Sequence, residues 1–171
     1  MGASTLFPSL FRYKAKANDD LFAAVGALDA PGLDDSLRAA IRVLNHVHVV
    51  DCIFQAHLTG TRHGLTATNT EETPTLPALR DAVMATDQWY INYTSNLGPA
   101  DLHQALCFLF TDGKQGRMSR EEILAHVITH GAYHRGAVGK ILDQQSIARP
   151  PDGLTNYLHS AEPDRRALAQ S

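Results

Sequence analysis

Cysteine is scarce in this sequence, with two among 171 residues. Cys52 and Cys107 lie far apart in the chain, and no Cys-x-x-Cys spacing occurs. A thiolate metal site and a disulfide framework both need paired cysteines, so neither is indicated. We therefore expect both cysteines to be small buried hydrophobic residues.

Strong charge of either sign is also lacking. The chain has 15 Lys and Arg against 18 Asp and Glu, and no run of basic residues forms the dense stripe that phosphate contacts need. No apolar run approaches the roughly 20 residues needed to cross a bilayer, and the first residues lack the basic and apolar regions of a secretion signal. We expect one cytoplasmic domain over residues 1–171, with neither nucleic acid nor a membrane as partner.

Several catalytic motifs are absent. The His-Glu-x-x-His motif of metalloproteases and the Glu-x-x-His motif of di-iron helix bundles do not occur. The Cys-x-x-Cys-His motif of covalent haem attachment is missing, as are a glycine-rich phosphate loop and the Gly-x-Ser-x-Gly elbow of hydrolases. These absences leave the nine histidines as the feature to explain.

Apolar residues recur at helical spacing in four long segments, which Gly and Pro residues separate. Either Asp34 or Asp35 is suited to cap the start of the second segment, and Gly60 to end it. Ser119 and Glu122 form a capping box at the start of the fourth. The predicted helices run over Pro8–Leu28, from Asp34 or Asp35 to Leu58, over Pro77–Leu97 and over Ser119–Gln145.

The segments between these helices differ in length. Residues 60–77 are rich in Gly, Thr and Pro and are interpreted as a long surface loop. The stretch "ALCFLFTDGKQGRMS" predicts a short β-hairpin or extended arm before the last long helix, and "LTNYLHS" predicts a short helix after it. Together these patterns predict an all-α fold, a four-helix bundle, whose facing helices can bring side chains to a ligand or metal.

Three of the histidines fall in the stretch "HVITHGAYHRG", at positions 126, 130 and 134. At about 100° per residue, His130 and His134 project about 40° apart on one helix face. Both interrupt an apolar stripe. Ile123 and Val127 precede the two histidines in this stripe, and Ala137, Val138 and Ile141 follow them. His126 lies at the edge of this stripe, and its direction stays open.

The second predicted helix carries two further candidates in "LNHVHVVD". His46 sits inside the apolar arc of this helix, whereas His48 projects away from it and is expected to approach Asp51. His57 shares the face of His46 but lies about 16 Å further along the helix, too far away to bind the same ion. The arc is formed by Ala39, Val43, Val47, Val50, Ile53 and Phe54.

Buried imidazoles need partners for both ring nitrogens, so three that converge would be costly if left unsatisfied. A divalent metal ion resolves this difficulty, because each ring gives one lone pair to the ion and its N–H to another acceptor. We therefore predict a metal site at His46, His130 and His134. Three imidazoles leave at least one coordination position open, as in catalytic zinc sites. Zinc and nickel are favoured, and iron, copper and manganese stay open, since imidazole is not selective.

Several motifs resemble those of the DinB family, the DNA-damage-inducible proteins of bacteria. The resemblance is carried by "LNHVHVVD" and "LAHVITHGAYHRGAVGKIL", and further by "RYKAKANDDLF", "FLFTDGKQGRMSREEIL" and "PDGLTNYL". It implies a four-helix bundle in an up-down-down-up arrangement, a divalent metal held by three histidines, and commonly a homodimer. Carried over by motif, Asn-His gives His46 and the His-Arg-Gly segment gives His130 and His134, whereas His126 is not normally a ligand.

The resemblance leaves the reaction open. The wider superfamily includes thiol-dependent S-transferases and a mycothiol-dependent maleylpyruvate isomerase, so the first hypothesis is an enzyme in which a metal-activated low-molecular-weight thiol or water attacks a small electrophile. Tyr133, Arg135 and His126 are candidates for orienting the substrate, although a surface or inter-helix ion pair is the preferred interpretation of Arg135, because most arginines are exposed. The second hypothesis is a non-catalytic metal-binding stress-response protein whose ion joins the second and fourth helices. A solvent-connected site favours the enzyme, and a fully packed site favours the structural role.

Overall fold

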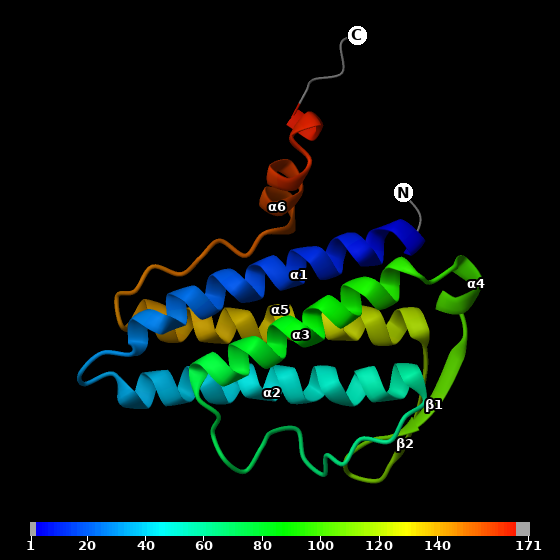
Figure 1. The fold of residues 1–171 in the computed structure, drawn as a ribbon, viewed down its shortest axis with the longest axis horizontal. Helices are drawn as coiled ribbons and strands as arrows, with labels where there is room; N and C mark the ends of the chain where they lie inside the picture. Colours follow the sequence, from blue (N-terminus) through cyan, green and yellow to red (C-terminus); the bar gives the residue numbers. More distant parts are fainter. Residues whose placement is uncertain (1–2, 167–171) are drawn as a thin grey trace.

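The computed structural model describes residues 3–166 and shows a mainly helical chain with one small two-stranded sheet (Figure 1). The expected helical class is confirmed. The long helices are α1 (Ala3–Val25), α2 (Asp34–Thr59), α3 (Leu76–Ser95) and α5 (Arg120–Gln144). The shorter elements are a 3-10 helix (Gly26–Leu28), α4 (Pro99–Leu102), β1 (Ala105–Leu109), β2 (Gln115–Ser119), α6 (Leu154–Ala161) and a second 3-10 helix (Pro163–Arg166).

The four long helices pack against one another in pairs. Helix α1 contacts α3 and α5, and α2 contacts the same two helices. Helices α1 and α5 run in one direction, and α2 and α3 run in the other (Figure 1). The long segment between α2 and α3 returns the chain to the end at which α2 begins, which is why these two helices are parallel (Figure 1).

The predicted helix ends are correct at α5 and at the end of α2. The Ser119 side chain accepts a hydrogen bond from the backbone N–H of Glu122 at 3.2 Å, and the backbone N–H of Ser119 donates to the Glu122 carboxylate at 2.6 Å. Gly60 ends α2 with a φ of 68°, the left-handed conformation that glycine adopts without strain. The hairpin is confirmed, with β1 and β2 antiparallel.

Three expectations about the helices are wrong. Leu33, not Asp34 or Asp35, is the N-cap of α2; both acidic residues lie in the first turn, where the helix dipole favours negative charge. Helix α1 begins at Ala3, five residues before the expected Pro8. This proline lies inside the helix and not at its start. Helix α4 was not expected, since four residues are too few to show a helical period.

The interior contains two apolar clusters separated along the helices by buried polar residues. One cluster lies towards the hairpin end of the four helices, and the other lies towards the turn between α1 and α2. On α1, for example, Phe11 belongs to the first cluster and Leu21 to the second, with Lys14 and Asn18 between them. Fold stability therefore depends on how this polar layer is satisfied.

Lys14 is the centre of the polar layer and is fully buried. Its ammonium group donates to Asp51 at 2.7 Å and to Asp87 at 2.6 Å, and the Asn18 amide donates to the second oxygen of Asp87 at 2.7 Å. Burial lowers the pKa of Lys14, but the two carboxylates more than offset this and raise the pKa above its ordinary value. Lys14 is therefore charged at neutral pH and joins α1 to α2 and α3.

The two cysteines differ in exposure. Cys52 is half-buried on α2, but Cys107 is exposed on β1. In β1 the side chain of Phe108 is buried and those of its two neighbours, Cys107 and Leu109, are exposed, because a two-stranded sheet packs only one face on the core. The expectation that both cysteines are buried is therefore wrong for Cys107.

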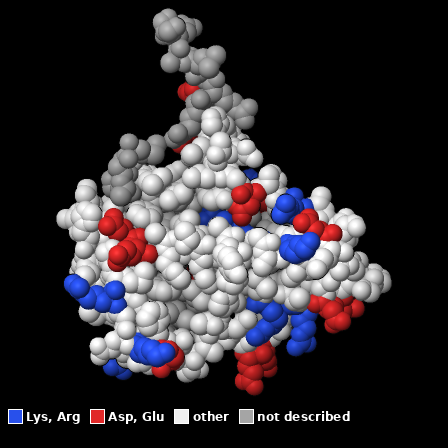
Figure 2. Space-filling model, turned by 180° about the vertical axis from the view of Figure 1, so that it is seen from behind, with Lys and Arg blue, Asp and Glu red and all other residues white. Residues whose placement is uncertain are grey.

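The surface seen in Figure 2 carries charges of both signs. Basic and acidic side chains are scattered in small groups among the described residues of this face, and neither sign forms a continuous area. This face lacks the extended basic surface that phosphate binding needs. None of the helices in the described part of the chain is long and apolar enough to cross a membrane.

Candidate metal centre

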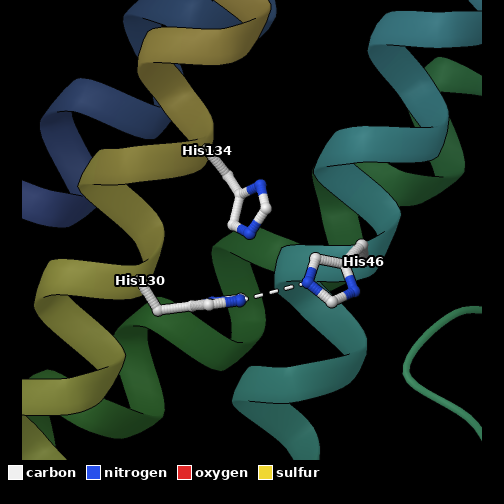
Figure 3. Close-up of side chains that lie close together, drawn as sticks. All are labelled: His46, His130 and His134. Atoms are coloured by element: carbon white, nitrogen blue, oxygen red, sulfur yellow. Dashed lines mark hydrogen bonds between the residues drawn. The ribbon is translucent and has the colours of Figure 1, made fainter.

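Helices α2 and α5 direct three histidine side chains towards one another (Figure 3). His46 comes from α2, and His130 and His134 come from adjacent turns of α5. One ring nitrogen of each histidine lies within 4.8 Å of the ring nitrogens of the other two. The structure thus brings together the three residues that the sequence analysis selected, and this cluster can hold a metal ion.

The planes of the three rings are steeply inclined to one another, by 61° to 73°. The centroid of His46 lies 5.0 Å from that of His130 and 4.7 Å from that of His134, and the two rings on α5 are 4.5 Å apart. The Nε2 atoms of His46 and His130 are separated by 3.1 Å. Two nitrogens bound to one tetrahedral zinc ion lie roughly 3.3 Å apart, given Zn–N distances of about 2.0 to 2.1 Å. His46 and His130 are therefore spaced as two ligands of one ion, and His134 lies close enough to be the third candidate.

A backbone carbonyl fixes the orientation of His46. The Nδ1 atom of this ring lies 2.7 Å from the carbonyl oxygen of Thr68. Because a carbonyl oxygen only accepts, Nδ1 carries the proton and donates it, which leaves the Nε2 lone pair facing the other two histidines. A metal ligand held in this way is both oriented and more basic.

The loop that carries Thr68 is attached to α2 by several hydrogen bonds. The buried Asn45 amide donates to the Thr70 hydroxyl at 2.6 Å and also to the Asn69 side chain. The Asn69 amide donates to the Arg42 carbonyl at 3.0 Å, and the Arg42 guanidinium donates to the Thr70 carbonyl at 2.6 Å. The sequence did not predict this role of the loop, although an Asn next to His46 on the same helix needs partners for its amide if it is buried.

The electrostatics keep the histidines of α5 neutral at neutral pH. Burial, together with the neighbouring His134 and His46, lowers the pKa of His130 to about 4. Burial and His46 also lower the pKa of His134. A neutral imidazole offers a lone pair to a cation, so both rings are in the form that a metal requires.

The three histidines lie at the edge of the core and are each half-buried. The interpretation that they interrupt the core face is wrong in this respect. Ala137 on α5 and Ala39 on α2 were assigned to the apolar faces of their helices but are exposed, so the buried face of each helix is rotated away from the predicted one. The interior at this level is filled by Lys14, whose Cε lies 3.4 Å from the position that a Cβ on Gly131 would take. The cluster is therefore accessible from solvent.

The remaining candidates on α5 lie in different surroundings. Tyr133 is 77% exposed, and its ring centroid is 5.1 Å from that of His134, so it stands beside the cluster at the surface. His126 stacks on His130 at 5.4 Å and packs on Phe54 at 4.8 Å, and burial lowers its pKa. Both are placed to contact a molecule at the cluster or to orient its ligands.

Arg135 and His48 take no part in the cluster. The Arg135 guanidinium donates to Asp152 at 2.7 Å and reaches Asn18 at 3.4 Å, so the predicted ion pair is present. It is buried and not at the surface, and its partner lies in the segment between α5 and α6 and not on another helix. The expected approach of His48 to Asp51 is wrong: the His48 ring lies 3.7 Å from the Cys52 sulfur, and a carboxylate oxygen of Asp51 accepts from Lys14 instead.

The chain is mainly helical, and three histidines on neighbouring helices converge so that they could hold a metal ion. These features define the class of helical proteins with a candidate metal site. The DinB family model matches residues 1–166, and the chain belongs to the DinB family. The resemblance seen in the sequence is thereby confirmed. Comparison with curated proteins gave no match, and comparison with solved structures gave none either.

Replacing Asn45 with alanine is expected to weaken metal binding about 10- to 100-fold, the usual effect of losing a group that orients a ligand. The substitution removes two of the four hydrogen bonds described above between α2 and residues 69 and 70, and so loosens the hold on the Thr68 carbonyl that orients His46. Competition with a chromophoric chelator measures the affinity. Asn92→Ala on α3, where the exposed side chain accepts from Gln88, is the matched control and should bind as wild type does. Equal affinities in the two variants would contradict the orienting role.

Proposed function

We propose that this DinB protein is a metal-dependent enzyme in which His46, His130 and His134 hold one divalent ion, zinc or nickel. It would act on a small electrophile with a low-molecular-weight thiol or water as the nucleophile, as an S-transferase or a hydrolase. The observation that supports this most is the position of the three imidazoles, which converge at a half-exposed edge of the α2–α5 contact and not within a closed core. Partial exposure of the ligands is what the approach of a reacting molecule would require.

The residues around the cluster have distinct parts in this proposal. When bound, a divalent ion supplies Lewis acidity that lowers the pKa of a water or thiol beside it. The Thr68 carbonyl holds the His46 proton at Nδ1 and keeps the opposite lone pair available. The exposed Tyr133 ring offers an apolar surface next to His134 on which a substrate can pack. His126 supports the His130 ring by stacking.

The architecture of the family extends the proposal. Because α1, α2, α3 and α5 pack in pairs with two helices in each direction, we propose that they form a single four-helix-bundle domain in the up-down-down-up order. A homodimer, and a thiol as second substrate, are proposed on the ground of the family resemblance.

A non-catalytic role is the second candidate, and one observation favours it. The three histidines come from two helices, so an ion bound by them would tie α2 to α5 and stabilise their packing. In that case metal removal lowers stability without removing any reaction. The two functions therefore differ in whether turnover depends on the ion.

An assay with and without chelator tests the enzyme hypothesis. Protein of known metal content is incubated with several low-molecular-weight thiols and a general electrophile, and product is measured. We expect turnover that chelation abolishes and that added zinc or nickel restores, and we expect Tyr133→Ala to raise KM several-fold more than it lowers kcat. Turnover that is unchanged after complete metal removal would show that the metal-dependent mechanism is wrong.

A further inference from the structure

A second pair of imidazoles lies at the far end of α2. His57 belongs to the last turn of this helix, and His63 belongs to the loop that follows. Their ring centroids are 5.2 Å apart, with the ring planes inclined at 70°. His57 is eleven residues beyond His46, which is roughly 16 Å along a helix, so the pair is separate from the three-histidine cluster.

Each ring of this pair has a buried nitrogen without a hydrogen-bond partner. These atoms are Nε2 of His57 and Nδ1 of His63. The other ring neighbours of His57 are aromatic: Phe108 stacks on it at 4.5 Å, and Phe54 meets it edge to face at 5.7 Å. Aromatic carbons cannot satisfy an imidazole nitrogen, and a buried polar atom without a partner is costly. Both nitrogens therefore need a partner, and one ion beside the two contacting rings would serve both.

We propose that His57 and His63 form a second site for a divalent transition-metal ion such as zinc. Two imidazoles on one tetrahedral ion hold their ring centroids roughly 5 Å apart, given metal–nitrogen distances of about 2.0 to 2.1 Å. The separation of 5.2 Å between His57 and His63 fits this value, and it resembles the 4.5 to 5.0 Å separations in the three-histidine cluster. Water or a small anion completes the coordination.

The second site binds its ion more weakly than the three-histidine cluster. Among the described residues, no third histidine, cysteine or carboxylate joins the pair in a group close enough to share an ion. One protein ligand fewer leaves more of the coordination to solvent. The site would attach the start of the 60–75 loop to α2, a few residues before the position at which Thr68 contacts His46.

Zinc stoichiometry in variants without the three-histidine cluster tests this proposal. The protein with His46→Ala and His130→Ala is dialysed against micromolar zinc, and bound metal is measured by atomic emission. We expect the wild type to bind two equivalents and this double variant to bind one. Adding His63→Ala, or adding His57→Phe so that packing on Phe108 is kept, should remove the remaining equivalent.

A matched control and two outcomes complete the experiment. His103→Ala removes an exposed histidine that contacts Glu121 and should leave the remaining equivalent in place. No zinc in the double variant, or an equivalent that survives both added substitutions, would overturn the second site. If the three-histidine site does not bind metal, the result is different. The wild type would then bind one equivalent of zinc. The double variant would keep that equivalent, and His63→Ala would remove it.

Discussion

His130→Ala is expected to abolish stoichiometric binding at the three-histidine site. The His130 ring lies close to both other ligands, with Nε2 at 3.1 Å from that of His46 and its centroid 4.5 Å from that of His134. Its loss leaves two imidazoles on separate helices, and affinity should fall by more than the 10- to 100-fold that follows from losing an orienting group. Titration with zinc or nickel in a His63→Ala background measures this site alone.

His48→Ala is the control for this prediction. His48 lies two residues from His46 on the same helix, but its ring contacts the Cys52 sulfur at 3.7 Å and takes no part in the cluster. Metal binding should therefore match the wild type. Loss of binding in the His48 variant and retention in the His130 variant would mean that the other face of α2 binds the ion.

Lys14→Met is expected to lower the free energy of unfolding by about 3 to 5 kcal/mol, the usual cost of removing one partner from a buried ion pair. The substitution leaves the Asp51 and Asp87 carboxylates at 2% and 3% exposure without their shared cation. Both acids must then be protonated or remain unpaired in the core. Urea unfolding of the metal-free protein, followed by far-UV circular dichroism, measures the change.

Lys16→Met on the same helix provides the comparison. Lys16 also forms an ion pair, with Asp20, but both side chains are exposed, at 59% and 37%. A surface pair of this kind contributes about 0 to 1 kcal/mol, so the variant should unfold close to the wild type. Similar losses in the two variants would show that the buried cluster does not depend on its lysine.

The sequence predicted the parts of the site that follow from helical spacing. His130 and His134 are one turn apart, and the apolar pattern of α2 distinguished His46 from His48 even though its exact direction was misjudged at Ala39. Contacts between distant segments were beyond such reasoning. The carbonyl of Thr68 has no side-chain signature, and the pairing of Lys14 with Asp51 and Asp87 depends on how three helices meet.

The same limit applies to the fold. Helix and hairpin patterns are local, so the long elements and the Ser119 capping box were found from neighbouring residues. Which helices contact one another is set by the whole chain, and the order of their packing entered only through the family resemblance. The pair formed by His57 and His63 also brings a helix end and a loop together, which periodicity alone cannot show.

The proton on His46 is positioned by a stretch of chain that has no regular secondary structure, through the carbonyl of Thr68. A rotation of one peptide plane there would withdraw the acceptor and let the ring turn, with every side chain near the ion unchanged. Substitutions within residues 66–72 are thus expected to change metal affinity while the packing of the long helices stays the same.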